Sequence, residues 1–142
     1  MQPFEDQIQS LVDQPSEKLT VELKPWIDPS SKKGQSVIAK ACLALRNQNG
    51  GFLLIGFDDN GSPLPLENGF DVRETFHADN IQKIVSQFAS KPFSVEVHFR
   101  QRDGVDYPVV QVESGVKTPV ACRADLKDTD GKRLLSVNKR WL

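Results

Sequence analysis

The feature that most constrains the fold is a glycine pair, Gly50-Gly51, between a helical pattern and an apolar run. Apolar residues recur at helical spacing over residues 35–48, and residues 52–57 are apolar except for Gly56. Asn49 and the glycines suit a left-handed helix cap, and a continuous apolar run suits a strand buried on both faces. Nucleotide-binding glycine loops instead follow a strand and open a helix. Because a helix C-terminus disfavours anions, the pair predicts a structural turn.

The remaining periodicity predicts a mixed sheet with three helices, an α+β single domain. The helices are expected over residues 3–13, 35–48 and 79–90, the last with Asp79 as its N-cap. The strands are expected over residues 19–24, 52–57, 93–99, 107–112, 116–121 and 134–137. The strongest hairpin signal is the Asp103-Gly104 turn between two alternating runs.

Composition excludes several classes of protein. A chain of 142 residues with 38% hydrophobic residues has the size of one domain, residues 1–142. It lacks the run of roughly 20 apolar residues that a membrane span needs, and its acidic N-terminus lacks a signal-peptide pattern, so we expect a cytoplasmic protein. Its cysteines and histidines show no zinc-ligand spacing, and Cys42 lies in an apolar run that predicts a buried free thiol.

Charge is unevenly distributed along the chain although the net charge is only −1. Residues 115–142 carry seven Lys or Arg and three Asp or Glu, whereas residues 1–114 carry 11 and 16. This pattern is typical of a solvated surface with a basic end, and it also fits an electrostatic footprint for an anionic partner.

Two groups of acidic residues are candidates for chemistry. Asp58 and Asp59 stand in an Asp-Asp-Asn-Gly sequence, which is typical of a plain turn and does not match a calcium loop. Glu17 lies just before a predicted strand, and Glu22 lies within that strand. Paired carboxylates can hold Mg²⁺ or Mn²⁺ for phosphodiester hydrolysis, although two rarely suffice without a third oxygen ligand.

Taken in order, these segments resemble the Schlafen/AlbA-type domain family. The resemblance is carried over about residues 16–121 by two segments, EKLTVELK at residues 17–24 and ALRNQNGGFLLIGFDDNG at residues 44–61. It implies an α+β two-layer sandwich related to Alba proteins, a nucleic-acid-binding activity and a possible place in transcriptional regulators. The family was earlier described as a divergent AAA, ATP-binding domain. Residues 122–142 would then lead into a longer protein, and paired Alba-like domains make a homodimer an expected arrangement.

The resemblance also implies a site. Some Schlafen proteins are metal-dependent RNA nucleases with two glutamates near a Glu-Phe-Lys motif and an acid before the glycine pair. Glu17 and Glu22 match the two glutamates, whereas Asn49 stands in place of the acid. An amide oxygen can ligate Mg²⁺ but brings no charge and cannot act as a base. This substitution puts nuclease activity in doubt and affects phosphate binding less, because phosphate contacts need only Lys, Arg and backbone donors.

Three functions therefore stay open. The leading prediction is a DNA- or RNA-binding module without a cofactor, in which basic residues contact the phosphate backbone: Lys24, Lys32, Lys33, Lys40, Arg46, Lys132 and Arg133. The first alternative is a Mg²⁺- or Mn²⁺-dependent RNA endonuclease that uses Glu17 and Glu22, with Asn49 as a weak third ligand. The second alternative is a degenerate domain that acts in protein interaction or oligomerisation.

Overall fold

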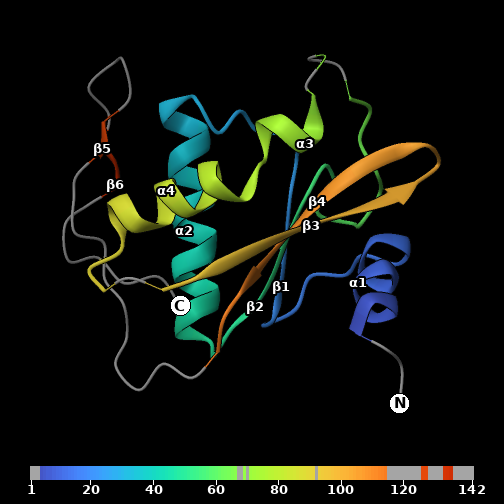
Figure 1. The fold of residues 1–142 in the computed structure, drawn as a ribbon, viewed down its shortest axis with the longest axis horizontal. Helices are drawn as coiled ribbons and strands as arrows, with labels where there is room; N and C mark the ends of the chain where they lie inside the picture. Colours follow the sequence, from blue (N-terminus) through green and yellow to red (C-terminus); the bar gives the residue numbers. More distant parts are fainter. Residues whose placement is uncertain are drawn as a thin grey trace.

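The computed structural model describes residues 4–66, 69, 71–91, 93–114, 126–127 and 133–135. Within them the elements follow one another as shown in Figure 1: α1 (Phe4–Asp13), β1 (Val21–Lys24), α2 (Lys32–Asn47), β2 (Gly51–Ile55), α3 (Val72–Thr75), α4 (Ala78–Phe88), β3 (Val95–Arg102), β4 (Val105–Val112), β5 (Leu126–Lys127) and β6 (Arg133–Leu135). None of the helices in these ranges is long and apolar enough to cross a membrane.

Four strands form a mixed sheet in the order β1-β2-β4-β3. β1 and β2 run parallel and are connected through α2, which is the usual way to join parallel neighbours. β2, β4 and β3 pair antiparallel. The β3–β4 hairpin turns at Asp103 and Gly104, whose φ angles of 52° and 79° are those of a two-residue turn with positive φ at both positions. The predicted mixed sheet and hairpin are thus confirmed.

The sheet buries apolar side chains on both faces. Leu53 and Ile55 of β2 pack into a cluster with α2, α3 and α4, whereas Leu54 packs into a second cluster with Ile8 and Val12 of α1. Figure 1 accordingly shows α1 on the opposite side of the strands from α2 and α4. Alternation along a strand sends neighbouring residues to opposite faces, so the apolar run of β2 is explained by burial on both sides.

The glycine pair follows a well-formed helix cap. The Gly50 N–H donates to the Leu45 carbonyl at 2.8 Å and the Asn49 N–H to the Arg46 carbonyl at 3.2 Å, the two bonds of a Schellman motif. Asn49 occupies the left-handed position with φ 73°. At Gly51 a Cβ would collide with the Thr20 carbonyl oxygen, so the absence of a side chain lets β2 approach the start of β1.

Several expected boundaries differ in the structure. β1 begins at Val21, and Leu19, expected on the buried face of that strand, is 76% exposed at a turn closed by reciprocal Lys18–Val21 backbone bonds. The N-cap of α4 is His77, whose Nδ1 accepts the Asp79 N–H at 3.1 Å. Asp79 therefore lies in the first turn, and its assignment as the cap was wrong.

Two short elements were not predicted. Helix α3 has four residues, too few for a periodic signal, and is capped by the Asp71 side chain, which accepts the Glu74 N–H. β5 pairs with β6, which overlaps the strand expected at residues 134–137. The strand expected at residues 116–121 lies outside the described residues.

Asp58 forms the expected turn. Its Oδ1 accepts the backbone N–H groups of Asn60 and Ser62, each at 2.9 Å, while its own carbonyl accepts the Gly61 N–H. The first carboxylate of this sequence is therefore occupied in holding the turn together.

Candidate functional site

Glu22 lies on the face of the sheet that α2 covers. It is in register with Leu53 of the parallel neighbour, and Leu53 belongs to the core cluster that includes α2. The Glu22 side chain reaches a hollow of about 120 Å³ between β1 and the C-terminal end of α2. The lining residues are Lys18, Leu19, Glu22, Ala44, Leu45 and Gln48. The predicted polar face of β1 is thus partly covered by the helix.

This position raises the pKa of the Glu22 carboxyl above its ordinary value of 4.5. Burial is the main cause, because it disfavours the charged form. The negative charge of Glu17 raises the pKa further, and the positive charge of Lys24 partly opposes both effects. A half-buried carboxyl with a raised pKa, beside a hollow, is typical of functional sites and also occurs in structural pairs.

Glu17 is exposed, and its Oε1 accepts the backbone N–H of Leu23 at 3.4 Å. This bond holds Glu17 against β1, one residue from Glu22. The structure therefore brings together the two carboxylates that the sequence singled out.

Asn49 does not line the hollow; the preceding residue, Gln48, does. Asn49 is exposed at the left-handed cap. Among the described residues, no group of three or more His, Cys, Asp or Glu side chains is placed to hold a metal ion. The hollow thus offers one carboxylate and one amide, with a second carboxylate nearby, and this set does not fit a metal ion held by the protein alone.

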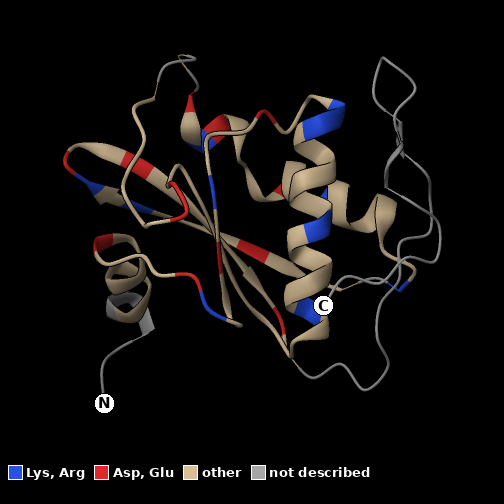
Figure 2. Ribbon diagram, turned by 180° about the vertical axis from the view of Figure 1, so that it is seen from behind, with Lys and Arg blue, Asp and Glu red and all other residues tan. Residues whose placement is uncertain are grey.

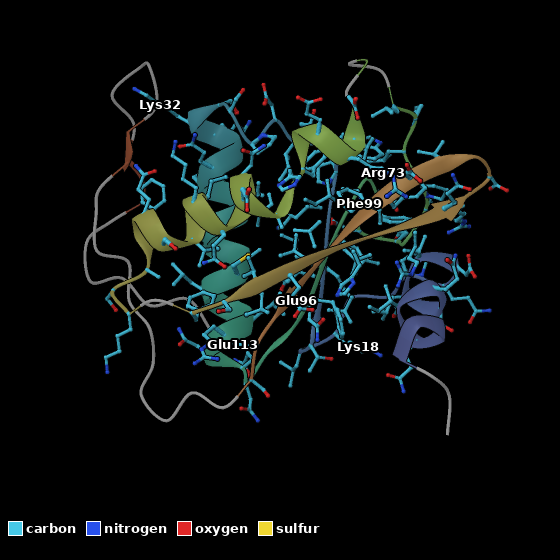
Figure 3. The ribbon with its side chains drawn as sticks, in the orientation of Figure 1. Lys18, Lys32, Arg73, Glu96, Phe99 and Glu113 are labelled. Carbon is cyan, nitrogen blue, oxygen red and sulfur yellow. The ribbon has the colours of Figure 1, made fainter. Side chains whose placement is uncertain are left out.

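The predicted basic residues are distributed along α2 and β1. Lys32 and Lys33 are exposed in the first turn of α2, Lys40 is partly exposed in its middle, and Lys24 is half-buried at the end of β1. Figure 2 shows Lys and Arg recurring along α2 from one end to the other. In Figure 3, Lys32 lies at the upper end of the molecule and Lys18 at the lower end. Lys132 lies outside the described residues, and Arg133 lies in β6.

Arg46 differs from the lysines because its guanidinium is engaged within the chain. Its Nη1 donates to the carbonyls of Glu113 at 3.0 Å and Ser114 at 2.9 Å, and lies 3.3 Å from the Glu113 carboxylate. The guanidinium carbon lies 5.5 Å from the centre of the Phe93 ring, and the side chain is only 13% exposed. Arg46 therefore ties the end of α2 to the segment after β4.

The fold and these residues define a class: an α+β domain with one carboxylate on an edge strand, a second just before that strand, and a lysine-bearing helix beside it. Comparison with known families makes the assignment specific. The chain belongs to the Schlafen, AlbA_2 family, whose model matches residues 17–138. Comparison with curated proteins gives no match.

Two solved structures share the fold. The crystal structure of the DIP2311 protein from Corynebacterium diphtheriae has a TM-score of 0.58 and 14% identity over 91% of this chain, which spans only 24% of that chain. The solution structure of the N-terminal domain of a protein from Nitrosomonas europaea, described as related to the ATP-dependent DNA helicase RecG, has a TM-score of 0.51 and 22% identity. That match covers 99% of this chain and 93% of the domain.

Proposed function

We propose that the chain is a nucleic-acid-binding module that contacts the phosphate backbone through the lysines of α2 and through Lys24. The observation that carries this proposal is the composition of α2, which contains four Lys or Arg and no Asp or Glu in 16 residues. Lys33 and Lys40 are seven residues apart, so they lie on one side of the helix about 10 Å apart along its axis. Two positive charges on one side of the helix can contact the same anionic backbone.

Membership of the Schlafen, AlbA_2 family and the helicase-related description of one fold neighbour support the proposal. We extend it to a role in a longer transcriptional regulator, in which this domain supplies binding with little sequence preference. Arg46 is assigned to structure rather than to phosphate contact, because its guanidinium already has partners. ATP is not proposed as a ligand, because the glycine pair lies at the C-terminal end of α2.

Fluorescence anisotropy with a labelled single-stranded RNA and a labelled DNA duplex tests the proposal. We expect the affinity to fall steeply between low and high salt. Replacing Lys33 and Lys40 together by Gln removes two phosphate contacts, so the slope of log K against log salt falls by about two. Lys91→Gln, which changes one charge in the exposed segment after α4, is a single-charge control and leaves the slope unchanged.

Three results separate the proposal from its alternatives. Absence of binding at low salt overturns it. An effect of Lys91→Gln about half as large as that of the double variant shows attraction by overall charge without a defined surface. A dimer or larger species in light scattering, with no nucleic-acid binding, favours the interaction module.

The second candidate function is a metal-dependent RNA endonuclease. The observation in its favour is the half-buried Glu22 carboxyl at the hollow, with Glu17 beside it. In this function Mg²⁺ or Mn²⁺ would act with the RNA phosphate supplying the missing oxygen ligands. Incubation of structured RNA with Mn²⁺ tests it, and cleavage by Glu22→Gln at the parent rate contradicts it.

A further inference from the structure

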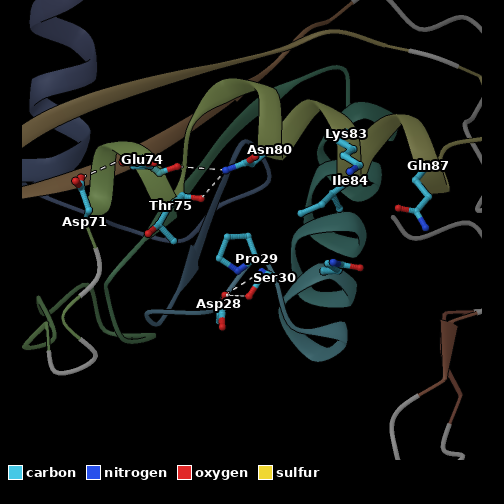
Figure 4. A pocket seen from close by; sticks show the side chains of 11 residues that line it. Asp28, Pro29, Ser30, Asp71, Glu74, Thr75, Asn80, Lys83, Ile84 and Gln87 are labelled. Atoms are coloured by element: carbon cyan, nitrogen blue, oxygen red, sulfur yellow. Dashed lines mark hydrogen bonds between the residues drawn. The ribbon is translucent and has the colours of Figure 1, made fainter.

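A second hollow lies away from Glu22. It measures about 650 Å³ and is bounded by the loop before α2, by α3 and by α4. Gln35 lines it at the start of α2, whereas Ala44 lines the Glu22 hollow near the helix end. Nine residues of helix separate the two, a rise of about 13 Å, so this cavity is a different site. Figure 4 shows it in close-up.

The cavity has an apolar floor and a polar wall. Pro29 and Ile84, both buried, supply apolar surface. The charged groups are three carboxylates, from Asp28, Asp71 and Glu74, against one ammonium, from Lys83. A volume of this size lies within the range of small-molecule sites.

The wall carries several hydrogen-bond acceptors. Among the described residues, Asp28 and Asp71 each accept through one carboxylate oxygen, Oδ1, and the Glu74 carbonyl accepts from Asn80. The Asn80 Nδ2 donates to the carbonyls of Glu74 and Thr75, at 3.2 and 3.3 Å, which fixes that amide and leaves its oxygen as an acceptor. A ligand that satisfies this wall must carry several N–H or O–H donors.

Charge narrows the class of ligand further. Three carboxylates against one lysine repel phosphate groups, so a nucleotide or a nucleic-acid backbone does not suit this cavity. A bare metal ion does not suit it either, because no group of three or more candidate ligand side chains converges in the part of the chain described. The apolar floor instead fits a chain of methylene groups, which would gain by leaving water.

We propose that this cavity binds an aliphatic polyamine, whose ammonium groups meet the carboxylates of Asp28, Asp71 and Glu74 while its methylene segments lie on Pro29 and Ile84. The inference does not rest on the proposed nucleic-acid binding, because none of the lysines assigned to phosphate contact lines the cavity.

Isothermal titration calorimetry of the isolated chain with spermidine tests the proposal. Glu74→Gln removes an attractive charge and weakens binding about two- to fivefold, the range expected for an exposed ion pair. Lys83→Gln removes the single repulsive charge and tightens binding by a similar factor. Asp59→Asn, at an exposed turn position outside the cavity, is the charge-matched control and leaves the dissociation constant unchanged.

The opposite signs of the two cavity variants distinguish a defined site from structural damage, since a misfolded variant would not bind more tightly. Circular dichroism should be used to check that all three variants are folded. The proposal is overturned if spermidine gives no heat of binding, if MgCl₂ at equal ionic strength displaces it as well as putrescine does, or if Asp59→Asn weakens binding as much as Glu74→Gln. Binding of a lysine-rich peptide without binding of spermidine would also overturn it and would identify a peptide-docking groove.

Discussion

Arg46 offers a direct test of the distinction between a structural cation and a ligand-binding one. The sequence predicted a phosphate contact, whereas the structure places its guanidinium on the carbonyls of Glu113 and Ser114 and over the Phe93 ring. The informative perturbation is Arg46→Met, which retains an unbranched aliphatic side chain and removes the charged guanidinium. Arg46→Lys is its partner because it keeps the charge and loses the planar geometry.

The expected cost follows from these contacts. Each charge-assisted hydrogen bond contributes about 1 kcal/mol here, at the low end of the range because the exposed Glu113 and Ser114 carbonyls can rehydrate. The ion pair with half-exposed Glu113 adds about 0.5 kcal/mol and the cation–π contact about 0.5 kcal/mol. Arg46→Met should therefore lower the free energy of unfolding by about 3 kcal/mol. Arg46→Lys should lower it by about half as much.

Urea denaturation followed by circular dichroism measures both values, and a thermal scan should show a decrease of about 3 °C per kcal/mol for a chain of this length. Anisotropy on the same samples, under conditions in which the variants are folded, should give a dissociation constant close to that of the parent. The structural role is refuted if Arg46→Met unfolds within about 0.5 kcal/mol of the parent while nucleic-acid affinity drops.

Three further outcomes are expected. The raised pKa of Glu22 means that the folded state binds this proton more tightly than the unfolded state, so the stability it contributes is lost as pH rises from 4.5 through the folded pKa. In urea titrations, the free energy of unfolding of Glu22→Gln relative to that of the parent should therefore be higher at pH 7 than at pH 4. The same difference at both pH values would contradict this. Asn49→Ala should cost about 1 kcal/mol more than Asn49→Gly, because φ is 73° there and only glycine adopts this conformation without strain. Equal unfolding midpoints of the two variants would argue against the left-handed cap. Burial raises the pKa of the Cys42 thiol to about 12, so the reactive thiolate is scarce at pH 8. In a Cys122→Ser background, a thiol reagent at pH 8 should therefore react with Cys42 only after denaturant is added. Rapid labelling of the native protein would contradict the burial of this thiol.

The parts of the fold that sequence predicted are those with a strong local period or local turn chemistry. The apolar run after the glycine pair predicted a strand buried on both faces, and Leu53 and Leu54 indeed enter different core clusters. The Asp103-Gly104 turn predicted its hairpin for the same reason, since its backbone conformation is set by two adjacent residues.

The structure differs from the sequence prediction where tertiary contacts and cap geometry determine the position of a residue. Leu19 continues the alternating pattern of β1, but the Lys18–Val21 turn removes it from the sheet. His77 caps α4 because its ring nitrogen reaches the Asp79 N–H, a geometry that composition does not signal. Arg46 was expected to lie off the apolar face and to contact phosphate, but its guanidinium donates to two carbonyls that lie 67 and 68 residues further along the chain.

The candidate site was predicted in part. Glu17 and Glu22 could be paired from their spacing and the family pattern. The structure places Glu22 in the edge strand β1 and Glu17 before it, bonded to the Leu23 N–H. Gln48 could not be identified, because which residue of a helix end faces the neighbouring strand depends on how the helix crosses the sheet. The 650 Å³ cavity was also invisible in the sequence, since three separate segments build its walls.

The contact between Gly51 and the Thr20 carbonyl has a consequence for how genetic data on this domain should be interpreted. Any side chain at Gly51 would push the start of β1 away from β2, and Glu22, two residues after Thr20, would move with it. A mutational screen scored for loss of site function should therefore recover Gly51 together with Glu22, although Gly51 touches no ligand. Such a hit would report the spacing between two strands.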